Sequence, residues 1–402
     1  MHALVYTGLA ILPSVLFSLV SVPVEKRRTS QQVVLTTLLI ANLLIPLHYA
    51  GTHSLFCMMM TAVWAWMNGL KMAVWLYCMP QEERRKRPYF GTLWYWRERK
   101  KQPPQTTTTK QQQQARAQTP DIIDSKNEAP LPPLSKSISL SSYIHTYLQH
   151  QILFDTLYLF ISFLDSKQSI DFFESTVAWL LRMPTSFPSI TNIVSSFWLC
   201  ILFSIYLQFQ LQVTYDAFMI GYGVLYHIMP YLGLPQRWAQ IIKTYIEEAA
   251  DMPPAFDSPW EATSLRDYWS NRWHQFYNTC FYRLAYVPLR RLCGSSKILR
   301  RTVPIWSVFA LSGIMHEYFL YCSAGPALYF GSKAGGWQLL FFLLQPIGIQ
   351  IGDSFPSGWP GRMWAISWMV LVSHLFVIPY LLCNYFTITR LQLLPLLITM
   401  FQ

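Results

Sequence analysis

Two histidines, His274 and His316, lie in parts of the chain that differ sharply in composition. His316 interrupts the apolar run of residues 303–322, which is long enough to cross a bilayer, and Glu317 follows it directly. An ionisable side chain at the centre of a spanning helix costs roughly 2 to 3 kcal/mol or more, so it indicates a functional site. A neutral imidazole in such a place can take a proton from a hydroxyl group as a general base. The alternative is a polar packing contact between helices.

Small side chains share the side of the predicted helix that carries His316. At about 100° per residue, this side also carries Phe309, Ser312, Gly313, Phe319, Leu320 and Ser323. The small residues Ser312 and Gly313 leave room beside the ring for a further group. Glu317 points about 100° away. We therefore expect it to bind a separate partner, such as an arginine of a neighbouring segment, and not to orient His316.

His274 belongs to the most organised polar segment of the chain, residues 258–277. Ser258, Pro259 and Glu261 form the pattern of a helix start with a capping box. The predicted helix has an apolar stripe on one side, made of Leu265, Tyr268, Trp269 and Phe276. The opposite side has a polar stripe of Asp267, Ser270, Asn271, His274 and Asn278. This stripe brings hydrogen-bonding groups near His274, although a stripe that simply faces water has the same pattern.

The elements that must hold these histidines are predicted to be membrane helices. Of the 402 residues, 52% are hydrophobic and 13% are charged, whereas soluble domains carry about 25% charged residues. A spanning helix needs about 20 apolar residues. We expect an all-α polytopic membrane protein of about seven to nine spans, with interfacial or re-entrant helices, such as those of residues 143–181, around a central reaction chamber. The predicted spans are residues 4–22, 33–50, 55–79, 193–210, 214–229, 303–322, 337–352, 363–383 and, less clearly, 388–401.

Basic residues predict the orientation of these spans. Residues 26–28 and 82–101 are rich in Lys and Arg and should face the cytosol, which places the N-terminus in the lumen. The first span lacks a basic segment before it and a cleavage site after it, so we expect it to be retained. Runs of Thr, Gln and Pro in residues 102–142 offer too little apolar surface for folding. The predicted organisation is N-terminal helices in residues 1–80, a cytosolic disordered insert in 81–142 and a membrane core in 143–402.

Several other kinds of site are not indicated by the sequence. The formal net charge of +11 comes mostly from basic residues that flank spans, so it does not predict nucleic-acid binding. The seven cysteines form no CxxC pair and no Cys/His metal spacing, and the sequence has no P-loop and no GxGxxG motif. We therefore expect no bound metal, no permanently bound cofactor and no nucleic-acid partner.

Two motifs in succession resemble those of a known family. Residues 264–275, Ser-Leu-Arg-Asp-Tyr-Trp-Ser-Asn-Arg-Trp-His-Gln, precede residues 309–317, Phe-Ala-Leu-Ser-Gly-Ile-Met-His-Glu. In this order and spacing they are similar to the two signatures of the wax-synthase-like branch of the membrane-bound O-acyltransferase superfamily. The architecture resembles that of fungal members that acylate terpenoid or polyketide alcohols. The resemblance covers mainly residues 258–353, because the N-terminal third agrees only in hydropathy.

The resemblance implies transfer of an acyl group from acyl-CoA, a co-substrate, to the hydroxyl of a hydrophobic alcohol in the endoplasmic reticulum membrane. The fungal members suggest acetyl-CoA and a terpenoid-type alcohol. The resemblance also implies that His316 is the catalytic base. His274 stands where related branches carry Asn, and it could position the thioester carbonyl or its oxyanion, with Asn271 and Asn278 as lesser candidates. The residues expected to bind substrate are Arg266, Trp269, Arg272, Trp273, Ser312 and Gly313.

Three other interpretations fit the same residues. A long-chain wax-ester synthase would use the same site with other substrates. A proton-coupled transporter could use His316 and Glu317 as a relay, although the sequence lacks the internal repeats typical of transporters. A non-catalytic scaffold would tolerate the loss of His316. The basic residues of 283–301 could bind the phosphates of CoA or anchor the following span at anionic lipid.

Overall fold

A computed structural model describes residues 2–21, 29–85, 91–94, 139–164, 166–181, 183, 189–250, 255–356 and 358–385. Within these ranges every regular element is a helix, and no strand occurs. Five of the helices are long and apolar enough to cross a membrane. They are α1 (Ala3–Val20), α2 (Thr29–His48), α8 (Ile190–Ile228, continued by a short 3-10 turn), α13 (Lys297–Gly331) and α15 (Trp359–Leu382). The prediction of an all-α polytopic membrane protein is confirmed.

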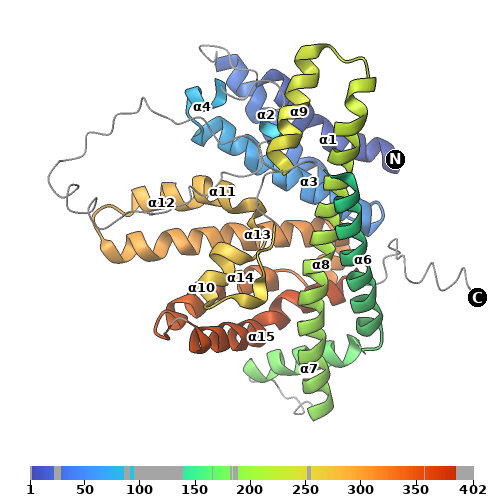
Figure 1. The fold of residues 1–402 in the computed structure, drawn as a ribbon. Helices are drawn as coiled ribbons and strands as arrows, with labels where there is room; N and C mark the ends of the chain where they lie inside the picture. The colour runs from blue at the N-terminus through green and yellow to red at the C-terminus, as the bar shows by residue number, and fades with distance from the viewer. Residues whose placement is uncertain are drawn as a thin grey trace, which may run out of the picture.

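The N-terminal helices α1, α2 and α3 (Leu55–Ala73) pack together at one end of the molecule (Figure 1). α3 runs on into a π-helical turn, Val74–Cys78. Phe17, Leu35 and Trp66 are buried between these helices, in one cluster with Met315 and Phe319 of α13. The N-terminal helices are thus packed against the helix that carries His316.

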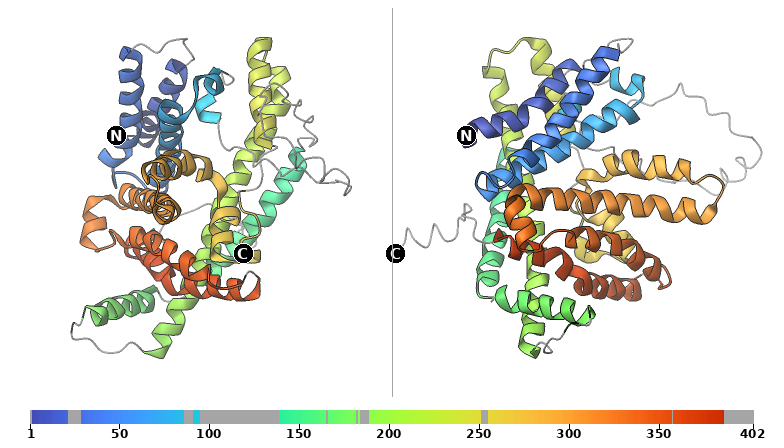
Figure 2. Two further views of the ribbon diagram at one scale, coloured as in Figure 1. Left: turned by 90° about the vertical axis from the view of Figure 1, so that its left-hand side faces the viewer. Right: turned by 180° about the vertical axis from the view of Figure 1, so that it is seen from behind.

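The longest helix, α8, runs the height of the molecule beside α6 (Leu140–Ser162), with α7 (Ser166–Leu180) near its first turns and α9 (Gln236–Ala250) after its last (Figures 1 and 2). α8 has 39 residues, which gives a length of about 58 Å at 1.5 Å per residue. The prediction of two separate spans, 193–210 and 214–229, is therefore wrong. The polar residues at and near the predicted break do not interrupt the helix, because they find partners. Asp216 is 5% exposed and lies 2.6 Å from His150 Nδ1 and 2.9 Å from Gln212 Nε2.

The helices α13, α14 (Trp337–Gly352) and α15 pack in succession and form the layer that carries the second motif (Figure 1). α13 kinks at Gly325, whose φ of 77° lies in the left-handed region. A Cβ atom at Gly325 would lie 2.9 Å from the Cα of Gly51, so the two backbones touch. Glycine at these two positions lets the chain turn after the His316 helix while it stays packed against the N-terminal helices.

Some predicted elements differ from the structure or lie outside the described residues. α14 has only 16 residues, fewer than the roughly 20 of a straight span, and α3 is also not among the five candidate spans. The region 143–181, predicted to hold interfacial or buried helices, forms α6 and α7. Residues 388–401 and most of the predicted insert, residues 95–138, lie outside the described residues.

Candidate active site

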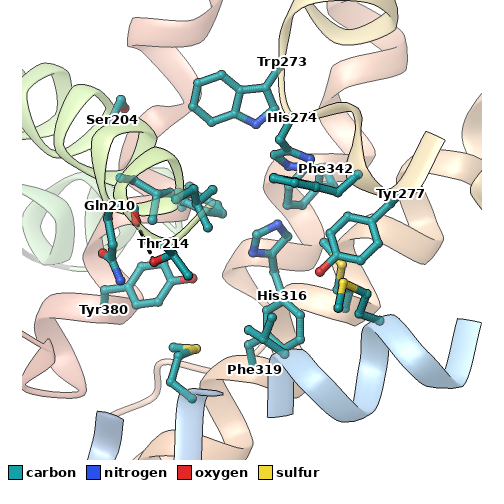
Figure 3. A pocket seen from close by; sticks show the side chains of 18 of the residues that line it. Ser204, Gln210, Thr214, Trp273, His274, Tyr277, His316, Phe319, Phe342 and Tyr380 are labelled. Atoms are coloured by element: carbon teal, nitrogen blue, oxygen red, sulfur yellow. Dashed lines mark hydrogen bonds between the residues drawn. The ribbon is translucent and has the colours of Figure 1, made fainter. Parts of the chain in front are cut away.

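An apolar cavity of roughly 230 Å³ lies among α3, α8, α13, α14, α15 and residues 268–277. Its walls are mostly aromatic and methionine side chains. His274 and His316 both line it, from one side of the cavity (Figure 3). The fold thus brings together the two histidines that the sequence analysis singled out.

Aromatic rings hold the imidazole of His316. Phe342 of α14 stacks on it with ring centroids 4.8 Å apart, and Phe376 of α15 meets it edge-on at 5.1 Å. Nδ1 and Nε2 of His316 are both buried, and neither has a hydrogen-bond partner among the described residues. A buried polar group without a partner costs about 1 to 3 kcal/mol. Packing therefore fixes the ring, while its two nitrogens face the cavity region without a hydrogen-bond partner among the described residues.

Glu317 points away from His316 and joins two helices. Its carboxylate accepts a hydrogen bond from Tyr329 Oη at 2.6 Å and one from the backbone N–H of Leu339, in the first turn of α14, at 2.9 Å. The helix projection predicted the direction of this side chain. The predicted arginine partner is wrong, because a tyrosine hydroxyl and a backbone amide occupy that place.

The segment that carries His274 is not the single capped helix that its sequence predicts. Ser258 has a left-handed φ of 43° and caps nothing with its side chain. The cap is Ser264, whose side chain accepts from the N–H of Asp267 at 3.1 Å. From there the chain forms α10 (Leu265–Asp267) and a π-helical turn, Tyr268–Arg272, and then becomes extended at Trp273.

Arg272 explains this irregular path. Its Nη1 donates to the backbone carbonyls of Asp257 at 3.2 Å and Ser258 at 3.1 Å, and its Nε donates to Asp267 Oδ2 at 2.9 Å. Asn271 Nδ2 donates to Asp267 Oδ1 at 2.9 Å. Burial raises the pKa of Asp267, but the hydrogen bonds from Asn271, the Thr263 N–H and Arg272 outweigh this and hold the pKa below its usual value.

Asn271 and Arg272 therefore belong to the framework of the loop. Neither side chain lines the apolar cavity or the more polar cavity described below, so their predicted roles, in oxyanion stabilisation and in substrate binding, stay predictions without support from this geometry. The helical projection failed here because the segment winds as an α-turn and then a π-turn, which changes the angle between successive side chains. The predicted polar stripe consequently splits, with Asp267 and Asn271 bonded to each other and His274 turned toward the cavity.

His274 is enclosed by aromatic side chains. The rings of Trp273 and Tyr277 lie 5.8 Å and 5.9 Å from its centroid, and that of Phe256 lies 6.4 Å away. Burial lowers the pKa of His274 to about 4, so the ring is neutral at physiological pH. Its Nδ1 is buried and has no hydrogen-bond partner within the described part of the chain.

A second, more polar cavity of roughly 340 Å³ meets the first at His274. The two cavities share Trp269, Trp273, His274 and Tyr277, and the second is also lined by Arg266, Ser270, Asn278 and Ser312. A molecule in each cavity would reach the same histidine. This arrangement suits a reaction between two substrates.

The other predicted binding residues divide between the second cavity and the framework. Arg266 lines the cavity while it makes a bidentate pair with Asp353, at 3.0 Å and 2.6 Å. Ser312 also lines it. Gly313 was predicted to leave room beside His316, and this prediction is wrong. Gly313 faces α14, where an added Cβ would lie 2.7 Å from Leu339 Cδ1. Its role is close helix packing.

Both motifs lie inside a stretch that matches a known family. Residues 252–344 match the family described as Membrane bound O-acyl transferase. The chain contains a membrane-bound O-acyl transferase domain. This confirms the resemblance that the two motifs indicated, and His274 and His316 both fall within the domain.

Relatives of this O-acyl transferase domain come from plants and fungi. A probable long-chain-alcohol O-fatty-acyltransferase 7 of Arabidopsis thaliana is 29% identical over 32% of this chain and 38% of the relative. An acetyltransferase of Aspergillus fumigatus is 28% identical over 28% of this chain and 19% of the relative. Acyl-CoA–sterol O-acyltransferase 1 of Arabidopsis thaliana is 27% identical over 23% of this chain and 26% of the relative. Each match thus spans well under half of the relative's length.

The aromatic side chains that hold His316 could not be predicted from the sequence. Phe342 and Phe376 contact His316 from helices that are predominantly apolar, and in such helices the sequence does not distinguish an aromatic residue that faces a cavity from one that faces lipid. Gln210 and Thr214 of α8 also line the apolar cavity. These two polar residues within an apolar run could have indicated that α8 faces a cavity. Their position instead suggested the break between two predicted spans.

The basic residues that follow the first motif are partly bound within the protein. Arg283 pairs with Glu83 at 3.1 Å and 3.2 Å, and Arg301 lies 3.8 Å from Asp353. Asp353 thus lies near two arginines, Arg266 and Arg301, at the end of α14. Among the described residues, no group of three or more His, Cys, Asp or Glu side chains is arranged to hold a metal ion.

Proposed function

We propose that the chain is an acyl-CoA-dependent O-acyltransferase whose acceptor is a hydrophobic alcohol. The observation that carries the proposal is the position of His274 and His316 in the O-acyl transferase domain. Both line one apolar cavity, and among the described residues neither His274 Nδ1 nor the two ring nitrogens of His316 have a hydrogen-bond partner, although all three atoms are buried. Buried polar groups normally have partners, so unpartnered imidazoles at a cavity suit a site where a substrate supplies the partner.

In the proposed reaction, His316 takes the hydroxyl proton of the alcohol while the alcohol oxygen attacks the carbonyl carbon of the thioester. The new C–O bond leaves negative charge on the carbonyl oxygen. When this intermediate collapses, the C–S bond breaks and the sulfur of CoA takes the proton from His316. The products are an ester and free CoA, and His316 returns to its neutral form. No acyl-enzyme is required, because both substrates meet in one chamber.

His274 is suited to hold the thioester carbonyl during this reaction. With a pKa of about 4, the ring is neutral and has one N–H to donate. A donor that is already aimed at the carbonyl oxygen stabilises the charge that develops there, and removal of one such donor typically costs about a hundredfold or more in rate. Asn278 lines the adjoining cavity but already donates to Gln275 Oε1 at 2.8 Å, so it is the lesser candidate.

The two cavities differ in the way that the two substrates would differ. The apolar cavity, walled by aromatic and methionine side chains, suits the hydrocarbon part of the alcohol. The second cavity, with Arg266 and several polar groups, suits the thioester and the polar arm of CoA. We propose that the phosphates bind on the same side, where Arg290, Arg291 and Arg300 are further candidates.

We further propose that the acyl group is acetyl and that the acceptor is a terpenoid-type alcohol. The reaction would take place in the endoplasmic reticulum membrane, with residues 81–142 in the cytosol. The acetyltransferase of Aspergillus fumigatus among the relatives supports the acetyl group. The long-chain-alcohol acyltransferases among the relatives favour the second candidate, a wax-ester synthase. The same residues would serve either reaction, so the substrates must be compared directly.

The test is product analysis in membranes that contain the full chain. We expect acetyl-CoA with a suitable alcohol to yield the ester and an equal amount of free CoA thiol, and palmitoyl-CoA to be a poorer donor. His316→Ala should abolish both signals, while His227→Ala, at an exposed histidine of α8 that lines neither cavity, should keep them. Equal product from wild type and His316→Ala, at equal amounts of folded protein, would overturn the proposed function.

A further inference from the structure

The apolar cavity has a polar wall opposite the two histidines. α8 contributes Ser204, Gln210 and Thr214 to the lining, and Figure 3 shows them across the cavity from His274 and His316. We call these three residues the α8 polar wall. None of them has a role in the proposed transfer of the acyl group, so their presence in an otherwise aromatic chamber requires its own explanation.

Gln210 is the best-positioned member of this wall. Its Oε1 accepts a hydrogen bond from Tyr385 Oη at 2.8 Å, and Tyr385 is 4% exposed and packs against Phe203 and Tyr380. This contact fixes the plane of the amide. No acceptor among the described residues binds the Nε2 of Gln210, which leaves two N–H donors on a partly exposed side chain that lines the cavity.

Ser204 and Thr214 complement the glutamine. The hydroxyl of Ser204 donates to the Cys200 carbonyl at 2.8 Å, and that of Thr214 donates to the Gln210 carbonyl at 2.8 Å. Their protons are therefore used within α8, but their oxygens can still accept a hydrogen bond. The wall offers donors from Gln210 beside acceptors from two hydroxyls. A carbonyl or a hydroxyl group of a ligand matches this set.

The location of Gln210 makes a purely structural role costly. The residue lies near the middle of α8, one of the candidate membrane spans, where an amide without its partners loses several kcal/mol of hydration. Polar residues inside a membrane span are costly and often belong to functional sites. Tyr385 satisfies only one side of the amide, so the other side suits a ligand.

We infer that the preferred alcohol carries a second polar group, a carbonyl or a hydroxyl remote from the reacting hydroxyl, and that Gln210 donates a hydrogen bond to it. This inference rests on the proposed function, because it takes the apolar cavity as the alcohol site. It distinguishes an oxygenated alcohol, bound at both ends, from a plain fatty alcohol that leaves the Gln210 amide unpartnered. A site built to bind a polar group rejects the analogue that lacks it.

The test uses hydroxy ketones, in which a primary hydroxyl and a carbonyl are separated by a growing number of methylenes. Each is paired with the alkanol of the same length that lacks the carbonyl, and kcat/KM is measured for both with one acyl-CoA. The wild type should prefer the hydroxy ketone by about tenfold at one favoured spacing, the worth of about one hydrogen bond. A ketone cannot itself be acylated, so the readout reports one reacting group.

Three variants separate recognition from structure. Gln210→Leu should lose the preference, because kcat/KM for the hydroxy ketone falls toward that for the matched alkanol. Gln208→Leu, two residues away on the same helix and outside both cavities, should keep it. Tyr385→Phe leaves the amide in place but loosens it, so the preference should fall only partly.

Each outcome decides the inference. A spacing-dependent preference that Gln210→Leu removes and Gln208→Leu retains supports it. The inference would be overturned if Gln210→Leu lowered kcat/KM equally for the hydroxy ketone and for the matched alkanol. It would also be overturned if the wild type favoured the plain alkanols at every spacing. In both cases, ester formation would still support the proposed function. Failure of every alcohol and every acyl-CoA to give product would instead overturn the proposed function and, with it, this inference.

Discussion

The two histidines lie on segments that position their side chains by different interactions, aromatic packing for His316 and a hydrogen-bond network for His274. His316 belongs to a long regular helix, and three phenylalanine rings from α13, α14 and α15 hold its imidazole. His274 belongs to a segment that changes from α-helix to π-turn to extended chain within a few residues, and a network around Arg272 shapes it. Packing fixes the first histidine, and hydrogen bonds far from the ring fix the second.

This difference shows where a histidine can be disturbed. The regular helix α13 does not depend on hydrogen bonds from the His316 side chain, which has none among the described residues. A substitution of His316 should therefore change the chemistry and little else. In residues 257–274 the backbone path itself depends on Arg272 and Asp267. Changes there should alter stability and the position of His274 together. The predictions below test this contrast.

The largest effect is expected for His316→Ala. The proposed reaction loses its general base, so kcat should fall by about a thousandfold, within the range of roughly a hundred to ten thousand typical of general acid–base catalysis. The apparent melting temperature should change little, because the helix keeps its other contacts. Thiol release and thermal unfolding of the purified protein measure the two quantities. A large fall in melting temperature would show that packing at His316 is as coupled to the fold as the Arg272 network.

His274→Ala should have the next largest effect, about a hundredfold in kcat, because one donor to the developing oxyanion is lost. His274→Asn is the informative companion, since an amide N–H can replace the ring N–H. We expect it to recover about tenfold of the loss. If alanine and asparagine reduced kcat equally, the second histidine would not act through a hydrogen bond.

Arg272→Met should reduce activity about tenfold although the residue lines neither cavity. The substitution leaves the carbonyls of Asp257 and Ser258 and the carboxylate of Asp267 short of a donor, at a cost of about 2 kcal/mol. The loop would then position His274 less well. Arg272→Lys keeps the charge but not the forked geometry, so it should restore only part of the stability. Wild-type activity and melting temperature in Arg272→Met would break the link between this network and His274.

The smallest effect is a pH dependence of stability that comes from His274. Its pKa is about 4 in the folded chain and about 6.5 in an unfolded one, so the unfolded state takes up a proton first as the pH falls. Stability should decrease by about 2 kcal/mol between pH 7 and pH 5. His274→Asn should remove this part of the slope. The depressed pKa of Asp267 acts only at lower pH, where its contribution is lost as the carboxylate is protonated.

Composition and hydropathy were enough to predict the class of fold, because a spanning helix satisfies its own backbone and needs only a continuous apolar run. The helical period of about 100° per residue predicted the direction of Glu317 relative to His316. Hydropathy failed at α8, where polar residues that include Gln212 and Asp216 suggested a break. Their partner His150 lies on α6, and no local pattern predicts such a contact.

The candidate site was predicted in part. His274 and His316 were recognised from their motifs, yet the rings that hold His316 come from α14 and α15, far along the chain. The capping pattern at Ser258 and Glu261 was locally sound. The cap does not form, because Arg272 donates a hydrogen bond to the carbonyl of Ser258, which has a left-handed conformation. Hydrogen bonds between residues that are distant in sequence decided each of these differences.

Chemical rescue tests the central claim, that His316 is the base, most directly. His316→Gly leaves space for a free imidazole in the apolar cavity beside Phe342. In membranes that contain this variant, acyl transfer should be about a thousandfold slower than in wild type, the scale of a lost general base, and should rise with imidazole concentration toward a plateau. The same titration should not affect His274→Ala. A His316→Gly variant that transfers acyl groups within tenfold of the wild-type rate without imidazole would contradict the account.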